Sequence, residues 1–406
     1  MTLSNPSSTS NQFTNVPIPN QFLGLMGILT GGAVATGGVL MAVLMALSAP
    51  MRGSETGLGG MALPQAAAVG ALGLALGAIL AVEGVRWRRG IPAAPFRPRR
   101  VRWLWLAFAV LLTAGTVASV LNAPPVLMAL FHAPTLLLLP VLVLSLVGWG
   151  LRGRGGSWAD VRSGLLSGAL LGTGTALVIE VALIVLLAVG LFALGLLPQE
   201  WLQQAPQALT TGEVPFPIGV EDLLEVLTPP LILVALVLIG GLVPLVEEVT
   251  KTLGVGLAGL WLRPSPARAF LLGVASGAGF ALAENMLNSL FVGPTWGPGV
   301  LARLAATFMH CATGGLMGWG WGQWWAGRRP WRLPLAFGGA VMLHSLWNSC
   351  AAGLVLSGLI ALARADNLVW TGAAGLLTLA LLGLLFLLAW GAAAATLWAS
   401  YRLGQL

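Results

Sequence analysis

Long apolar stretches separated by short polar breaks run along almost the whole chain. Each stretch holds roughly 18 or more predominantly apolar residues, which is enough for a helix to cross about 30 Å of hydrocarbon. They predict ten membrane spans, near residues 22–48, 65–85, 103–121, 126–149, 164–197, 229–262, 269–292, 301–325, 334–360 and 369–399. We therefore expect an all-α polytopic membrane protein of about ten transmembrane helices.

The spans differ in how cleanly they are bounded. The segments 164–197 and 229–262 are longer than a membrane requires, so we expect them to be tilted, kinked or partly interfacial. The third and fourth spans are separated only by the short break Asn122-Ala-Pro-Pro125. Residues 1–21, rich in Ser, Asn, Thr and Pro, predict a disordered tail.

The composition agrees with a membrane protein. The chain has 406 residues, 57% of them hydrophobic and 8% charged, and its mean hydropathy is +0.90. Soluble domains carry about 25% charged residues, so this chain cannot build a water-compatible surface over its whole length. The cysteines Cys311 and Cys350 both fall in apolar segments and suggest neither a disulfide framework nor a zinc cluster.

The basic residues mark one side of the membrane. They gather in alternate loops, at 86–102, 152–162, 263–268, 328–332 and at Arg402. The loops on the opposite side contain Arg52 and Arg364. By the positive-inside rule, both termini are predicted to be cytoplasmic in a multi-pass protein of the cell membrane. The net charge of +7 is thus a topology signal, and we expect the lipid bilayer, not nucleic acid, as the surrounding partner.

This topology divides the chain into four parts. Residues 1–21 form the cytoplasmic tail, and 22–228 form N-terminal spans of unknown role that end in an acidic external loop at 198–228. Residues 229–360 form a core that carries the unusual polar groups, and 361–406 form the last span with a short cytoplasmic tail. The sequence leaves the oligomeric state open.

The core begins with two adjacent carboxylates and the only lysine of the chain inside an apolar segment. The run Leu242–Leu253 contains Glu247, Glu248 and Lys251. A charged side chain at the centre of a bilayer costs about 2.5–3.5 kcal/mol on insertion scales, so such residues are seldom kept without a function. Lys251 follows the two acids by one helical turn and can neutralise either, which leaves the other carboxylate free to accept a proton.

Backbone breakers precede these acids. Pro244 removes a helical hydrogen bond, and Gly240-Gly241 loosens the preceding turn. We expect a kink that opens the helix beside the acids.

The next three spans each add polar groups of the same kind. The first brings Glu284-Asn285. The second brings His310, with Arg303 seven residues before it on the same helix face. The third brings His344, with Asn348 at i,i+4. An isolated histidine in an apolar helix is usually a core residue, but two histidines, three carboxylates and an amide on four consecutive spans favour one shared site. His132 and Glu180 have no polar partner at helical spacing, so we interpret His132 as a core or interfacial residue and leave Glu180 outside the site.

Four ordered motifs carry a resemblance to a known family. They are Glu247-Glu248-x-x-Lys251, Gly279-Phe280-Ala281-x-x-Glu284-Asn285, Arg303 through His310 with Gly314 and Gly318, and His344-x-x-Trp347-Asn348. Over about residues 240–350 the chain resembles the PrsW family of intramembrane proteases, which is similar in motif order to the CAAX prenyl endopeptidases and bacteriocin-processing membrane proteins. The resemblance implies cleavage of a membrane-anchored protein, of the sort that releases an anti-sigma factor, with glutamates and histidines as the essential residues.

The polar groups suggest a mechanism of peptide hydrolysis. Glu247 or Glu248 takes a proton from a water held with His310, while His344 and Asn348 polarise the scissile carbonyl. Lys251, Glu284, Asn285 and Arg303 are assigned supporting roles.

A zinc-dependent variant stays open. It places Zn²⁺ on His310, His344 and a glutamate, most simply Glu284. Because the chain has no HExxH pair, the glutamic form without a metal is slightly favoured. In both forms, Glu247→Gln or Glu248→Gln is expected to abolish cleavage in a protein that still folds.

Two other functions fit part of the pattern. A proton-coupled transporter also uses intramembrane acids, histidines and broken helices, but the sequence shows no repeated half with matching broken helices. A non-catalytic scaffold of the same fold would have no need for the complete set of polar residues. Two assays distinguish a carrier from a protease: a carrier transports a solute in proteoliposomes, whereas a protease cleaves a single-span reporter protein.

Overall fold

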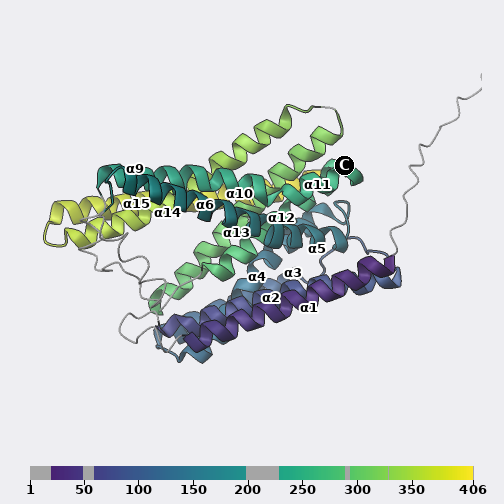
Figure 1. Cartoon of the computed structure of the whole chain (residues 1–406), viewed down its shortest axis with the longest axis horizontal. Coiled ribbons are helices and arrows are strands. Elements are labelled where there is room, and N and C mark those ends of the chain that lie inside the picture. The colour runs from purple at the N-terminus through teal and green to yellow at the C-terminus, as the bar shows by residue number, and fades with distance from the viewer. Residues whose placement is uncertain (1–19, 49–58, 198–227, 289–292, 328, 406) are drawn as a thin grey trace, which may run out of the picture.

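A computed structural model describes residues 20–48, 59–197, 228–288, 293–327 and 329–405. These residues form ten helical spans that are long and apolar enough to cross a membrane (Figure 1). In chain order the elements are α1 (Asn20–Ser48), α2 (Gly59–Arg89), α3 (Val101–Val120), α4 (Pro125–Leu151), α5 (Trp158–Leu166), η3 (Ser167–Gly172), α6 (Thr173–Ala193), α9 (Pro229–Val237), η4 (Leu238–Leu242), α10 (Val243–Lys251), α11 (Leu253–Leu262), α12 (Pro266–Leu287), η5 (Gly293–Thr295), α13 (Trp296–Trp325), α14 (Arg332–Ala363) and α15 (Leu368–Leu403). The predicted all-α fold with ten spans is confirmed.

The short break between the third and fourth spans is a true turn. Asn122 has a φ of 53°, in the left-handed region, and the following α4 begins at Pro125. A left-handed Asn ends one helix, and a proline at the first helical position starts the next at no hydrogen-bond cost.

The two overlong spans are composite. The span Trp158–Ala193 contains the π-helical segment η3, and the span Pro229–Leu262 contains the π-helical segment η4. Each π segment widens one turn and changes the direction in which the following side chains point. The span predicted at 269–292 ends at Leu287, and residues 289–292 lie outside the described residues.

Helix α12 forms the centre of the protein. Most of its apolar window is buried inside the protein, and it packs against α13, α5, η3 and α4. Its approach to α13 depends on glycine: a Cβ atom on Gly273 would lie 2.1 Å from the carbonyl oxygen of Gly314. Close backbone contact of this kind is a common way to pack helices in lipid.

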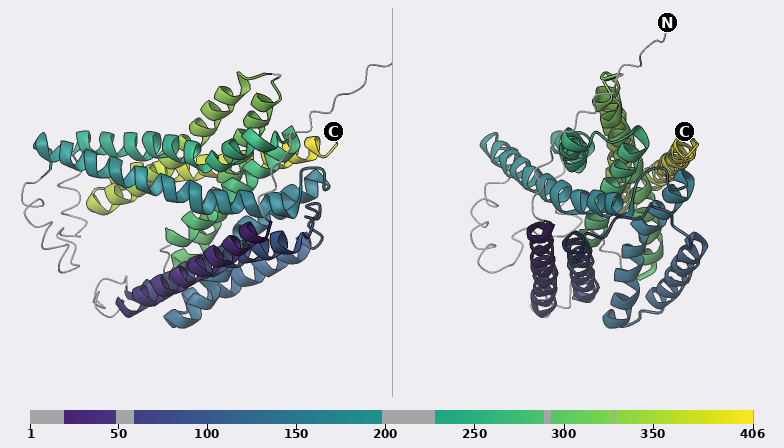
Figure 2. Two further views of the ribbon diagram at one scale, coloured as in Figure 1. Left: turned by 45° about the vertical axis from the view of Figure 1, so that its right-hand side comes forward. Right: turned by 90° about the vertical axis from the view of Figure 1, so that its right-hand side faces the viewer.

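The N-terminal helices flank this centre. Helices α1 and α2 form a pair along one edge of the bundle (Figure 2), where a Cβ on Gly38 would lie 2.6 Å from the Cα of Gly73. Gln65 of α2 donates to the carbonyls of Met286 and Leu287 at 2.7 and 2.8 Å. The amide thus satisfies carbonyls at the C-terminal end of α12, which have no partner within the helix.

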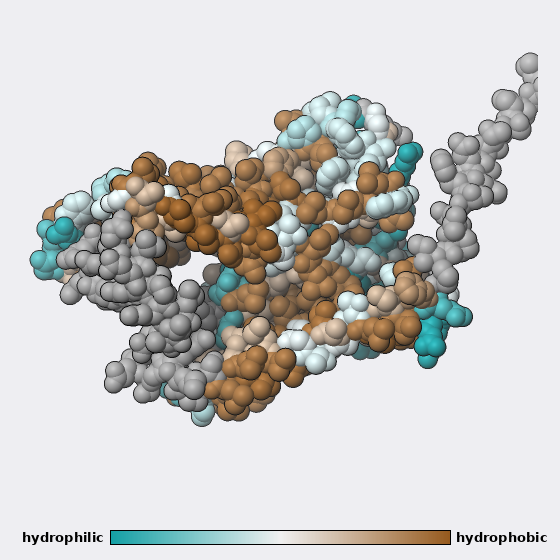
Figure 3. Space-filling view, in the orientation of Figure 1, coloured by the Kyte–Doolittle hydropathy of each residue, from teal (hydrophilic) through white to brown (hydrophobic). Residues whose placement is uncertain are grey.

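The outer surface of the bundle is apolar over broad areas (Figure 3). Large exposed side chains such as Val178, Leu186 and Phe386 are two-thirds or more exposed, as expected for groups that face lipid tails. The protein is therefore a multi-pass membrane protein, while the cytoplasmic position of its termini stays a prediction. Residues 1–19 of the predicted tail and 198–227 of the predicted external loop lie outside the described residues.

Candidate active site

The site begins with a local distortion of the sixth span. Pro244 has no N–H group, and in η4 the N–H of Val243 donates to Leu238 in an i→i+5 bond. The carbonyl of Ile239 is then left without a backbone donor, because the residue five positions later is Pro244. Asn348 of α14 fills the gap, since its Nδ2 donates to that carbonyl at 3.2 Å. The helix is thus distorted just before the acids, where a kink was predicted, and a side chain of a distant helix contacts the distorted turn.

Glu248 points into the protein and is fully buried. Its Oε1 accepts from Lys251 Nζ at 2.5 Å and lies 2.8 Å from Nδ1 of His344. Lys251 is also fully buried, with Thr313 Oγ1 at 3.4 Å and the ring of Phe280 at 4.9 Å from its Nζ. A buried carboxylate paired with an ammonium and an imidazole can remain charged in an apolar surrounding.

Glu247 leaves the helix in a different direction. Its Oε2 lies 3.4 Å from Nε2 of His344 and has no hydrogen-bond partner, and the residue is 9% exposed. The two adjacent glutamates therefore contact opposite nitrogens of the same imidazole. Glu248 Oε2 also lacks a hydrogen-bond partner, but the other oxygen of that carboxylate contacts Lys251 and His344, so Glu247 has the less engaged carboxylate of the two.

His310 enters from α13, and glycine brings it close to α12. A Cβ atom on Gly277 would lie 2.1 Å from the carbonyl oxygen of His310, so the two backbones can touch only with glycine at this position. The ring of His310 packs edge-on against the ring of His344, with 5.0 Å between centroids. Its Nε2 lies 2.7 Å from Oε2 of Glu284, and its buried Nδ1 has no hydrogen-bond partner.

Glu284 and its neighbours form a polar network on the other side of His310. Arg303 places Nη2 3.1 Å from Glu284 Oε1 and donates from Nε to Asn285 Oδ1 at 2.8 Å. Asn285 in turn donates to Thr307 Oγ1 at 3.0 Å, and Thr307 donates to the carbonyl of Arg303 at 2.7 Å. Arg303 thus contacts Glu284 and Asn285 together, which agrees with the supporting position expected for it.

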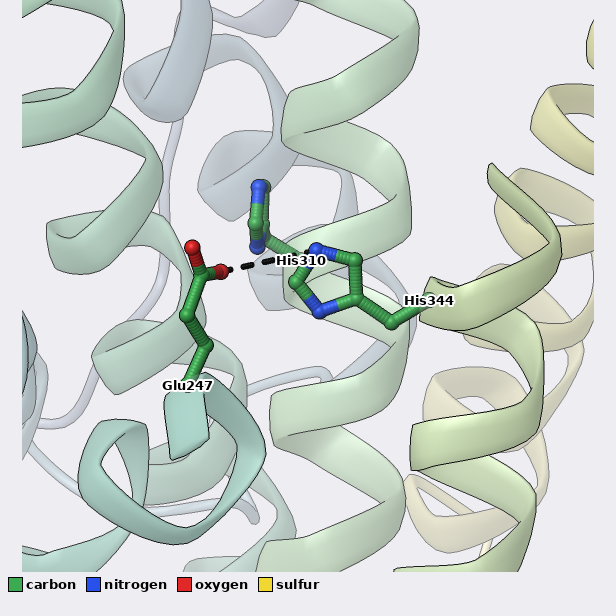
Figure 4. A group of neighbouring side chains, drawn as sticks. All are labelled: Glu247, His310 and His344. Atoms are coloured by element: carbon green, nitrogen blue, oxygen red, sulfur yellow. Dashed lines mark ion pairs between the residues drawn. The ribbon is translucent and has the colours of Figure 1, made fainter. Parts of the chain in front are cut away.

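Three helices bring their polar groups to one point. Glu247, His310 and His344 each offer a ligand atom, and these atoms lie within 4.8 Å of one another (Figure 4). The sequence-based interpretation had placed Glu284 with the two histidines, but in the structure Glu247 completes this group and Glu284 lies beside His310. Glu247 lies on α10, which directly follows η4, and its Oε2 faces Nε2 of His344.

The group fits a zinc ion by its chemistry. Two imidazoles and a carboxylate are ligands that zinc prefers, and Glu247 Oε2 and His310 Nδ1 are buried atoms without a hydrogen-bond partner. Zinc bonds of 2.0–2.1 Å place tetrahedral ligands about 3.4 Å apart, so the three ligand atoms, which lie within 4.8 Å of one another, would move closer together around the ion. The bond between Glu248 and Nδ1 of His344 is the kind of outer contact that orients a metal-binding histidine.

Two polar residues, His132 and Glu180, were left outside the site in the sequence-based interpretation, and the structure gives them different surroundings. His132 is fully buried and its Nδ1 accepts from Trp296 Nε1 at 3.1 Å, which confirms a core histidine. Glu180 of α6 interacts electrostatically with both Glu247 and Glu284, so it belongs to the surroundings of the site. The sequence did show that Glu180 is a carboxylate in an apolar span, which is unusual. Helical spacing could not show that it interacts with residues of other helices.

Comparison with known proteins agrees with this geometry. No curated protein and no solved structure matched the chain. Residues 218–370, which contain Glu247, Glu284, His310 and His344, match the family model described as PrsW family intramembrane metalloprotease. The resemblance seen in the sequence is thus confirmed over residues 218–370, and the match supports a membrane-embedded protease.

Proposed function

We propose that the protein is an intramembrane endopeptidase that hydrolyses a peptide bond of a membrane-anchored protein substrate. The observation that carries the proposal is the convergence of Glu247, His310 and His344 within 4.8 Å, from three helices, inside apolar spans. Buried groups of this kind are costly in a membrane and serve a reaction better than they serve packing.

In this proposal Glu247 is the proton acceptor for the attacking water. The Oε2 atoms of Glu247 and Glu248 are both buried without a hydrogen-bond partner, but the other oxygen of Glu248 is engaged by Lys251 and His344. A general base must reach the proton that it removes directly or through one water, and Glu247 has the less engaged carboxylate. Glu248 acts as a positioning residue that holds the ring of His344.

His310 and His344 then hold the water and the scissile carbonyl. The two rings lie at right angles 5.0 Å apart, so both can face a small group placed between them and Glu247. Asn348, one turn beyond His344, is proposed to assist at the carbonyl oxygen, and its present bond to Ile239 keeps α14 against the distorted turn. Arg303 and Asn285 hold Glu284 beside His310.

A zinc ion, if the protein uses one, would be held by Glu247, His310 and His344. When bound at such a site, zinc makes water acidic enough to give a nucleophile at neutral pH and polarises a carbonyl oxygen. Glu284, which is paired with Arg303 and lies 2.7 Å from Nε2 of His310, would then be the carboxylate beside the ligands that accepts a proton.

The substrate class follows from the resemblance and the topology. We expect a single-span protein whose cleavage releases a soluble domain, such as an anti-sigma factor in stress signalling. We also propose that the enzyme lies in the cell membrane with both termini in the cytoplasm, because the arginine-rich loops share one side.

The test compares cells that express the wild type with cells that express Glu247→Gln, by mapping new protein N-termini in the membrane fraction. We expect single-span proteins cut within or next to their membrane segment in wild-type cells and intact in the variant. Asp366→Asn, which alters an exposed carboxylate outside the site, is the matched control and should cleave as the wild type does. Identical sets of N-termini from wild type and Glu247→Gln, at equal expression, would contradict the proposal.

A further inference from the structure

A second pocket lies at the arginine-rich end of the bundle and shares no residue with the candidate active site. Its volume is about 370 Å³, and its wall comes from the loop after α2, the end of α4 and the end of α15. The lining residues are Arg97, Pro98, Gly148, Trp149, Gly150, Arg152 and Tyr401.

The loop that carries Arg97 is anchored by its neighbour. Phe96 is 2% exposed and packs edge-on against Trp158, with 4.6 Å between ring centroids. The N–H of Phe96 donates to Gly156 at 2.9 Å, and the N–H of Trp158 donates to Ala94 at 3.0 Å. The backbone just before Arg97 is therefore fixed against the loop that follows α4.

Two glycines let the arginine loop lie directly on the end of α4. A Cβ atom on Gly148 would lie 2.6 Å from Cδ of Pro98, and one on Gly153 would lie 2.2 Å from Nε of Arg97. Gly153 also has a φ of +80°, which favours glycine. The side chain of Arg97 is thus held close to the backbone at the end of α4.

The second arginine is held by an aromatic ring. Arg152 has a φ of 53° at the C-terminal end of α4, and its guanidinium lies 5.3 Å from the ring centroid of Tyr401. Among the described residues, neither Arg97 nor Arg152 forms an ion pair with an acid, whereas Arg162 pairs with Glu83 and Arg268 pairs with Asp160. Two guanidinium groups that have no ion-pair partner in the described part of the chain offer a site for an anion.

Aromatic residues place the pocket at the membrane surface. Trp149 is 69% exposed and Tyr401 is 44% exposed, and both rings border the pocket. Exposed Trp and Tyr at the ends of membrane helices lie at the level of the lipid headgroups. The pocket therefore opens where phosphate groups of the bilayer are found.

We propose that this pocket binds the phosphate of an anionic phospholipid headgroup. The guanidinium groups of Arg97 and Arg152 supply donors in a planar fork, which suits phosphate oxygens, and they keep their charge at any physiological pH. Basic pockets between membrane helices bind anionic headgroups by the same chemistry. Inorganic phosphate offers the same oxygens, so the test separates the two sources.

The experiment uses the full chain, delipidated in detergent, and measures lipid adducts by native mass spectrometry together with the unfolding temperature. The probes are phosphatidylglycerol, phosphatidylcholine with the same acyl chains, and inorganic phosphate. We expect phosphatidylglycerol to bind to the wild type and raise its unfolding temperature, and the double variant Arg97→Gln/Arg152→Gln to bind it at least about tenfold more weakly. The control Arg88→Gln/Arg89→Gln removes the same charge from exposed positions at the same end and should bind as the wild type does.

Three outcomes would overturn the proposal. Equal binding of phosphatidylglycerol by the wild type and Arg97→Gln/Arg152→Gln would show that the pocket is not the site. Equal retention of phosphatidylcholine would show that acyl chains alone bind. Protection by inorganic phosphate to the same extent as by phosphatidylglycerol would assign the pocket to a soluble anion. Helix content measured by circular dichroism confirms that the double variant is folded in each comparison.

Discussion

Glu248 and His344 meet across helices α10 and α14, with the carboxylate Oε1 2.8 Å from the imidazole Nδ1. This contact fixes the ring so that its other nitrogen, Nε2, faces Glu247 at 3.4 Å. The same carboxylate oxygen also accepts from Lys251, so one buried acid connects a charge pair to a site residue. We propose that Glu248 holds the ring of His344 in position, so that its replacement changes the stability of the protein as well as the position of that ring.

From the sequence alone, Glu248→Gln was expected to leave the protein folded, but the fully buried pair with Lys251 changes this expectation, and the variant should destabilise the protein. Lys251 is fully buried and would lose its counter-charge, and an unpaired buried charge costs about 3–5 kcal/mol. The measurement is the unfolding free energy in detergent. The double variant Glu248→Gln/Lys251→Met should recover most of the loss, because it removes both charges. A double variant as unstable as Glu248→Gln alone would show that the charge pair is not the cause.

The contact between α12 and α13 gives a second expectation. Gly277→Ala would place a Cβ atom 2.1 Å from the carbonyl of His310 and force the helices apart. Overpacking of this kind costs about 1–3 kcal/mol, and it would also shift the ring of His310 and lower cleavage. Gly338→Ala is the matched control, because a Cβ at Gly338 meets no atom within 4 Å. If Gly277→Ala has wild-type stability and activity, the close approach has no role in placing His310.

The fold was accessible from the sequence because a membrane imposes simple rules on it. Ten apolar stretches gave ten helices, and the Asn and Pro residues at 122–125 gave the turn between α3 and α4. The polar residues of the site were also recognisable, since Glu247, Glu284 and the two histidines are rare types in apolar spans. The convergence of these residues follows from the same cost of isolated polar groups in lipid.

Which of these side chains meet one another could not be predicted, because it depends on contacts between helices that helical spacing does not specify. The angle between Glu247 and Glu248 is fixed by the helix, but helical spacing does not give the rotation of that helix about its axis. In the structure Glu247, not Glu284, completes the group with His310 and His344. Glu180 was left aside for a similar reason, because the acids with which it interacts lie on α10 and α12.

Arg303 offers a test of the network beside His310. Arg303→Lys keeps the charge but loses the fork that contacts Glu284 and Asn285 at once, at 3.1 and 2.8 Å. We expect cleavage to fall about tenfold or more, with stability changed by about 1 kcal/mol, because the residue is partly exposed. Initial rates with a substrate found by N-terminal mapping provide the measurement. As a control, Arg329→Lys alters an exposed arginine in the segment after α13 and should leave the cleavage rate unchanged. A wild-type rate for Arg303→Lys would mean that a positive charge beside Glu284 suffices for cleavage.

The three histidines of the chain allow a direct test of the metal. If Glu247, His310 and His344 hold zinc, the purified wild type should contain about one zinc per chain, and His310→Ala or His344→Ala should lose it, since each removes a ligand. His132→Ala is the matched control: this histidine is buried and bonded to Trp296, so the variant loses some stability but keeps its zinc. Elemental analysis measures the content, and a chelator should stop cleavage by the wild type. A wild type with less than about one-tenth zinc per chain and chelator-resistant cleavage would leave Glu247 as a base that works without a metal.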